Sequence, residues 1–174
     1  VVALDPTYTG QEIIPVVVVT SDTDCPLTEG VHYQAAFDNN IRCGLGRAVI
    51  TGIGPCADPD AAPIVDYFAI VPASPEIVSL SAQNGEIRLS VKDLSDTGAD
   101  GYEAQYRLKG TDAWTTASFE AGSTDLVISG LAAGEYELQA RAFVDNTDAP
   151  ADAAEYNRMI EYGDYSDIRT VTVP

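Results

Sequence analysis

The chain has few basic residues. Nine lysines and arginines stand against 27 acidic residues, which gives a formal net charge of -18 over 174 residues. Proteins bind phosphate backbones and anionic lipid headgroups mainly through Lys and Arg. We therefore expect no nucleic-acid partner and no attraction to a membrane surface, and we interpret the excess carboxylate as a solubilising surface.

Long apolar runs are also missing. The longest, Ile13–Val19, is interrupted by Pro15 and is far shorter than the ~20 residues that span a bilayer. We expect no membrane insertion in this segment. The chain starts at Val1 without a basic region followed by an apolar one, so we expect a mature segment of an extracellular protein whose secretion signal or anchor lies outside it.

Catalytic and metal-binding residue types are scarce. The chain has one histidine, His32, and three cysteines, Cys25, Cys43 and Cys56. A Cys43–His32 pair would need a third residue to orient the base, and the sequence offers no candidate. Zinc would need more soft ligands than these. We therefore expect neither an enzyme nor a cofactor.

Short runs of alternating apolar and polar residues are abundant. They are Ile87–Val91, Tyr102–Leu108, Tyr136–Ala142 and Val171–Val173, and clusters of Gly, Asp, Asn and Pro separate them. A period of two is typical of half-buried strands. No stretch has a helical stripe, and Ala149–Met159 would form at most a short turn of helix. The sequence predicts an all-β fold.

Two prolines in the segment Val71–Glu76 mark a domain boundary. Pro72 and Pro75 remove backbone donors and favour an extended linker between two strand-like stretches. We predict two tandem β-sandwich domains, residues 1–72 and 73–174.

From Ala73 onward the chain resembles a fibronectin type III domain. The residues that carry the resemblance are Pro75–Ile77, Ile87–Val91, Gly101–Arg107, Leu126–Leu131, Gly134–Ala142, Tyr165–Ser166 and Ile168–Val173. The resemblance implies that the hydroxyl of Tyr136 bonds a backbone group near Leu131, in a tyrosine corner. Val91 stands where the family usually has a core tryptophan, so Trp114 either fills that volume from another strand or lies on an outer face.

Residues from about 5 to 71 resemble an immunoglobulin-like repeat of bacterial surface proteins. The pattern consists of Tyr8–Gly10, Pro15–Val19, Leu27–Gly30 with Tyr33, Asp38–Asn40, Gly46–Gly54 and Phe68–Ile70. Asn39 and Asn40 tolerate a left-handed backbone, which suits a turn. Together the two resemblances imply an Ig-like sandwich followed by a fibronectin type III-like sandwich, and in both families such modules serve as spacers or recognition units.

The three cysteines all fall in the predicted first domain. A strand over Arg47–Gly52 would hold Cys43 and Cys56 roughly 20 Å apart, beyond the reach of a disulfide. If His32–Phe37 pairs antiparallel with that strand, Cys25 approaches Cys56. We predict a Cys25–Cys56 bridge, which would stabilise the domain by roughly 3 kcal/mol, and Cys43 would remain a lone thiol.

Two sets of residues are weaker candidates for binding. Carboxylates cluster at Asp22–Asp24, Asp58–Asp60 and Asp93–Asp100. Asp58 and Asp60 lie nearest the junction in the sequence and are the preferred candidates if a calcium ion stiffens it. Tyr156 and Tyr162 belong to the long connection between Asp145 and Asp164, where exposed rings could stack on a sugar. The alternative interpretation is that these rings cover the edge of the domain.

The sequence therefore predicts a non-catalytic structural and adhesive spacer of a bacterial cell-surface or secreted multidomain protein. Its expected partners are other domains of the same polypeptide and a host protein or glycan. The alternative is an accessory carbohydrate-binding portion of a secreted glycoside hydrolase or another extracellular enzyme.

Overall fold

The computed structural model describes residues 6–20, 27–156 and 159–174. The chain forms two compact units. Unit 1 comprises Val1–Val71 and Asn146–Met159, and unit 2 comprises Pro72–Asp145 and Ile160–Pro174. The first change of unit falls one residue from the predicted boundary. Residues 146–159, which the prediction gave to the second domain, belong to unit 1 instead.

The predicted all-β fold is confirmed for the described residues. The strands are β1 (Tyr33–Asp38), β2 (Gly44–Gly52), β3 (Ile64–Ile70), β4 (Ile77–Gln83), β5 (Glu86–Val91), β6 (Gly101–Leu108), β7 (Thr115–Ser118), β8 (Asp125–Ile128), β9 (Gly134–Asp145), β10 (Ile160–Tyr162) and β11 (Arg169–Val173). Short 3-10 turns lie at Gly54–Cys56, Ser95–Thr97 and Ala151–Tyr156. The last of these matches the expected short turn of helix.

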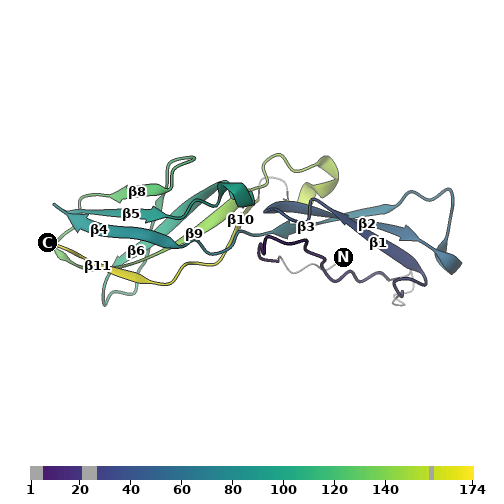
Figure 1. Ribbon diagram of the computed structural model, residues 1–174, viewed down its shortest axis with the longest axis horizontal. Coiled ribbons are helices and arrows are strands. Elements are labelled where there is room, and N and C mark those ends of the chain that lie inside the picture. The colour runs from purple at the N-terminus through teal and green to yellow at the C-terminus, as the bar shows by residue number, and fades with distance from the viewer. Residues whose placement is uncertain (1–5, 21–26, 157–158) are drawn as a thin grey trace. The chain divides into compact units, whose positions relative to one another are not determined.

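Unit 2 is a sandwich of two antiparallel sheets (Figure 1). One sheet has the order β4-β5-β8, and the other has the order β10-β9-β6-β7 with β11 also pairing with β9. The alternating apolar residues of the strands point between the sheets, where Ile87, Leu89 and Leu138 are almost fully buried. Alternation along the sequence therefore located the core, because successive side chains of a strand face opposite sides.

The tyrosine corner predicted at Tyr136 is confirmed. Its hydroxyl donates a hydrogen bond of 3.2 Å to the carbonyl of Ala132, next to Leu131. Trp114 does not join the core of unit 2. It is partly buried with the guanidinium of Arg107 lying 4.4 Å from its ring centroid, so it lies on an outer face.

Unit 1 contains a three-stranded antiparallel sheet of order β1-β2-β3. Tyr33 lies opposite Gly52 and Asp38 opposite Arg47, which confirms the predicted hairpin. The connection turns at Asn39, which has a φ of 53° in the left-handed region that asparagine tolerates. Phe68 and Ile70 of β3 pack with Ile13 to form one apolar cluster of the unit.

The second sheet of the predicted Ig-like sandwich is not found in the described part of unit 1. The valine-rich segment 13–19 forms no strand there. Pro15 lacks a backbone donor, and the segment is held by scattered bonds such as Ile13 N–H to the Asn40 carbonyl at 2.8 Å. Two tandem sandwiches are therefore not confirmed, and neither is the bacterial Ig-like module.

Within the described residues, no helix has the length and apolar character needed to cross a membrane.

Candidate binding groove in unit 2

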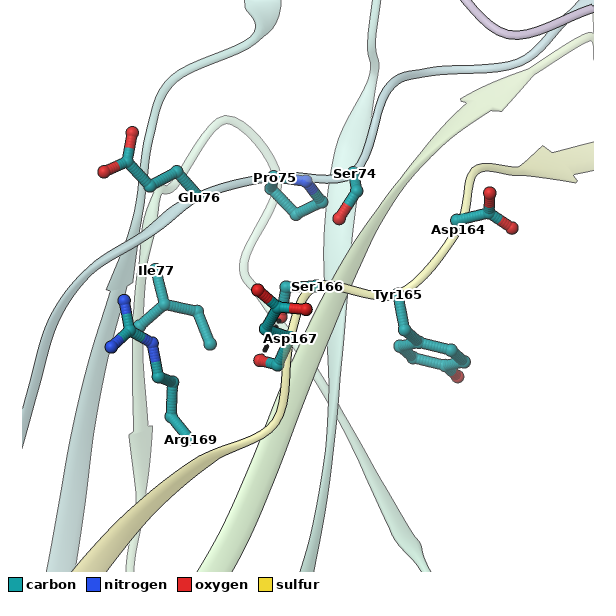
Figure 2. A pocket seen from close by; sticks show the side chains of 9 residues that line it. All are labelled: Ser74, Pro75, Glu76, Ile77, Asp164, Tyr165, Ser166, Asp167 and Arg169. Carbon is teal, nitrogen blue, oxygen red and sulfur yellow. Dashed lines mark hydrogen bonds between the residues drawn. The ribbon is translucent and has the colours of Figure 1, made fainter.

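An open pocket of about 490 Å³ lies in unit 2 where the segment before β4 passes the segment before β11 (Figure 2). Its lining residues are Ser74, Pro75, Glu76, Ile77, Asp164, Tyr165, Ser166, Asp167 and Arg169. A second, smaller pocket of about 260 Å³ shares Ile77 and Arg169 with the first and continues along Val78–Leu80 and Thr170. We call the two pockets together the β4/β11 groove.

The groove exists because the last strand of the sandwich is interrupted. The chain leaves the β9 ladder after Tyr162 and rejoins it at Arg169. Between these points the N–H of Gly163 donates to the carbonyl of Ala142 at 3.0 Å, and the N–H of Ser166 donates to the carbonyl of Ala140 at 2.7 Å. The Ser166 hydroxyl accepts the Ala140 N–H at 3.0 Å. A side chain thus takes a ladder position, and the backbone bulges outward.

Gly163 permits a close approach of the chain at the start of unit 2. A Cβ built on this buried residue would overlap the carbonyl group of Pro72. No residue larger than glycine fits there without a shift of backbone, because the neighbour is not a flexible side chain. Gly163 therefore fixes the path of Pro72 toward β4.

The groove is acidic, and its lining contains no cysteine to act as a nucleophile and no histidine to act as a base. Its lining contains three carboxylates, Glu76, Asp164 and Asp167, against one guanidinium, Arg169. All four residues are exposed. Such a surface attracts cationic groups.

Behind the groove, the side chain of Arg141 is held between two aromatic rings. Its guanidinium carbon lies 3.7 Å from the ring centroid of Tyr162 and 4.6 Å from that of Tyr165. Nη2 of Arg141 lies 2.6 Å from Oε1 of Glu103, and Nε donates to the same oxygen at 2.8 Å. Cation–π contacts and a charge-assisted pair thus lock the rings on either side of Gly163.

The hydroxyl of Tyr165 completes this cluster by donating to Oε1 of Glu103 at 3.1 Å. Burial is the main cause that raises the pKa of Tyr165, and the hydrogen bond to Glu103 raises it further. The phenol therefore stays protonated as a donor through neutral and mildly alkaline pH.

The two predicted contact tyrosines belong to different units. Tyr162, in unit 2, is 37% exposed, but Arg141 lies over its ring and Phe143 packs against it with ring centroids 5.8 Å apart. Tyr156, in unit 1, is half-buried and its hydroxyl donates to the carbonyl of Tyr67 at 3.3 Å. Both rings therefore have packing roles, and their role in ligand contact stays a prediction.

The calcium candidates form a local turn in unit 1. Asp60 N–H donates to Oδ1 of Asp58 at 3.0 Å, and both residues are exposed. Across residues 6–20, 27–156 and 159–174, no three His, Cys, Asp or Glu side chains gather as a metal site would require. A calcium ion at Asp58 and Asp60 remains an untested prediction.

The predicted Cys25–Cys56 bridge involves a residue outside the described part of the chain, Cys25. The prediction places the segment before His32 beside the segment after Gly52, and Ile53 N–H donates to the carbonyl of His32 at 2.8 Å. Cys56 is exposed and forms no disulfide with another described residue. Strand β2 separates Cys43 from Cys56, as expected. The bridge itself stays a prediction.

The sequence interpretation missed Arg141 and Glu103 as the centre of a cluster. One signal was available, since Tyr162 and Tyr165 flank a Gly-Asp pair immediately before the last strand. The pairing of Glu103 opposite Arg141 depends on the register between β6 and β9, which local alternation does not reveal.

The sheet orders and the tyrosine corner define unit 2 as a fibronectin type III-like sandwich. No protein-family model matches the chain, and no curated protein matches it.

Solved structures with a similar fold include one described as a myokine structure, which is 14% identical with a TM-score of 0.46 and covers 59% of this chain and 98% of that chain. The FN1-FN3 domains of chicken CNTN1 are 16% identical with a TM-score of 0.48, covering 76% of this chain and 43% of that one. A cytokine receptor complex is 20% identical with a TM-score of 0.48, covering 94% and 81%. At these identities the similarity concerns the fold alone.

Proposed function

We propose that the chain is a non-catalytic, load-bearing spacer and interaction module of an extracellular multidomain protein. The observation that supports this proposal is the direction of the terminal strands of unit 2. Residues 74–77 lie beside 164–169, and 77–80 lie beside 169–170, so β4 and β11 run in the same direction. Figure 1 also shows both strands directed toward the C-terminal end of the unit.

This arrangement places a pulling force along the strands. The unit starts at Pro72, just before β4, and ends at Pro174, just after β11. A pull on its two ends therefore loads the β4–β5 and β11–β9 ladders in shear. Hydrogen bonds loaded in shear must break together, whereas bonds at an opened end break one at a time. This geometry suits a spacer that keeps its fold under tension.

The setting of the proposal follows from the sequence. The net charge of -18 suits a highly soluble exterior protein, and the resemblance of residues 5–71 to bacterial surface repeats leads us to propose a bacterial cell-surface or secreted protein. Its partners would then be neighbouring domains of the same polypeptide and a host protein or glycan.

Single-molecule force spectroscopy on the full chain, held by its two ends, tests the load-bearing role. We expect a distinct force peak for the unfolding of unit 2. Because residues 146–159 belong to unit 1, residues 72–174 are freed as extended chain of about 340 Å only when unit 2 has unfolded and that segment has detached. Extension of that length without a force peak would contradict the proposal.

A variant of β4 gives a matched control for the same measurement. Ser81 lies directly opposite Arg88 of β5. The Lys92 N–H donates to the Glu76 carbonyl, so the even-numbered residues of β5 direct their backbone N–H and C=O groups toward β4. Ser81→Pro therefore removes a loaded ladder bond and should lower the unfolding force, whereas Ser81→Ala keeps the bond and should not.

A further inference from the structure

Two strands of unit 2 have one open edge each beside the β4/β11 groove. Among the described strands, β4 pairs with β5 alone and β11 pairs with β9 alone. An unpaired strand edge presents backbone N–H and C=O groups that can form a ladder with another extended chain.

The hydrogen bonds of β9 identify which groups of β11 face outward. Lys109 N–H donates to the Glu135 carbonyl, so the odd-numbered residues of β9 bond to β6. The even-numbered residues of β9 direct their backbone N–H and C=O groups toward the last strand. The hydrogen bond from the Ser166 N–H to the Ala140 carbonyl confirms this direction. Tyr136 and Leu138 lie opposite Val171 and Arg169. Val173 likewise lies opposite Gly134, so the residues of β11 that direct their N–H and C=O groups to the open edge are Thr170 and Thr172.

The charge beside this edge favours a basic occupant. Glu76, Asp164 and Asp167 outnumber Arg169 in the groove, and the whole chain carries a net charge of -18. A second copy of the chain would bring equal negative charge and be repelled.

The rim of the groove adds apolar contacts. Val78 lines the smaller pocket and is 56% exposed, and Ile168, which lies in sequence between the groove residues Asp167 and Arg169, is 50% exposed. An extended peptide directs alternate side chains to opposite faces, so a segment that alternates basic and apolar residues matches both the carboxylates and the rim.

We propose that the β4/β11 groove binds an extended, lysine- or arginine-containing peptide segment of another protein, which adds as a strand to the open edge of β11. The peptide backbone pairs with Thr170 and Thr172, and its basic side chains face Glu76, Asp164 and Asp167. This inference deepens the interaction part of the proposed function and rests on it.

Fluorescence anisotropy with the full chain tests the proposal, using a labelled ten-residue peptide of alternating lysine and valine as the probe. We expect saturable binding that weakens as salt is raised from 50 to 500 mM, because screening reduces the attraction between exposed charges. A peptide of alternating glutamate and valine, and the Lys-Val peptide N-methylated at every second residue, should bind at least tenfold more weakly.

Variants of the chain separate edge pairing from charge attraction alone. Thr172→Pro removes an outward N–H without removing a bond to β9, so we expect at least tenfold weaker binding with an unchanged melting temperature. Thr172→Val keeps the N–H and should bind like the wild type. If Thr172→Pro lowers the melting temperature, the triple variant E76Q/D164N/D167N, which leaves the backbone unchanged, provides the test by the same tenfold criterion.

Three results would overturn the proposal. The first is no binding of the Lys-Val peptide at all. The second is equal binding by wild type and Thr172→Pro, which would mean attraction without strand addition. The third is a dimer of the chain in sedimentation that Thr172→Pro abolishes, which would make a second copy the occupant. The force measurement uses no peptide, so the load-bearing role and this binding site can fail independently.

Discussion

Replacing Arg141 by methionine should destabilise unit 2 substantially. The substitution keeps much of the apolar volume but removes the charge between the rings of Tyr162 and Tyr165. It also leaves the carboxylate of Glu103 without its cation in a site where the side chains of Arg141 and Glu103 are 25% and 12% exposed.

The size of the effect follows from these contacts. Two cation–π contacts contribute about 0.5–1 kcal/mol each at partly exposed positions, and hydrogen bonds to a charged group contribute about 1.5–3 kcal/mol. Packing by the methionine side chain offsets part of this loss. We expect Arg141→Met to lower the free energy of unfolding by about 2–4 kcal/mol. Arg141→Lys keeps the charge but loses the planar stacking, so it should cost about 1–2 kcal/mol.

Urea denaturation followed by tryptophan fluorescence measures this directly. Trp114 is the single tryptophan of the chain and lies in unit 2, so its emission reports the unfolding of that unit. A double-mutant cycle with Glu103→Gln isolates the coupling between the two charges.

Arg88→Met is the matched control, because Arg88 forms an ion pair of 2.9 Å with Glu86 on the surface of the same unit, with side chains 65% and 36% exposed. We expect this control to change stability by less than about 0.5 kcal/mol. If Arg141→Met has an effect as small as the control, the cluster does not hold the last strand and the reasoning is wrong.

Three further changes in unit 2 have defined outcomes. Gly163→Ala should cost about 1–3 kcal/mol by overpacking against the carbonyl group of Pro72, and an unchanged urea midpoint would show that the backbone yields there. Tyr136→Phe should cost about 1 kcal/mol because the hydroxyl loses its bond to Ala132; the same midpoint measures it, and no loss would mean that the corner bond contributes nothing net. Burial raises the pKa of Tyr102 above its ordinary value of 10.0, so its contribution to stability is complete below that pH and is lost as pH rises through the folded-state pKa. Between pH 8 and 11, the melting temperature of Tyr102→Phe should therefore fall less steeply above pH 10 than that of the wild type. Parallel curves of melting temperature against pH would refute this.

Features encoded by local alternation and by turn residues were predictable. The core of unit 2 followed from apolar residues spaced two apart, as at Ile87, Leu89 and Val91. The hairpin of unit 1 followed from the asparagines at its turn, since Asn39 adopts the left-handed backbone expected.

Features that depend on strand register or on long-range packing were not predictable. The β4/β11 groove arises where Ser166 replaces a backbone position in the β9 ladder, and nothing in its local sequence distinguishes it from an ordinary turn serine. The valine run of unit 1 has strong strand propensity, yet segment 13–19 forms no strand, because propensity alone does not supply a pairing partner.

The division of the chain has a consequence for how this protein can be rearranged. Residues 146–159 belong to unit 1 although residues on both sides of them belong to unit 2. Neither unit is encoded by one uninterrupted stretch of gene. If recombination or truncation divides the chain between Val71 and Pro72, residues 146–159 stay with unit 2 and unit 1 loses them. We therefore expect the two units to be duplicated, exchanged and lost together. Evolution would then act on the whole segment and not on unit 1 or unit 2 separately.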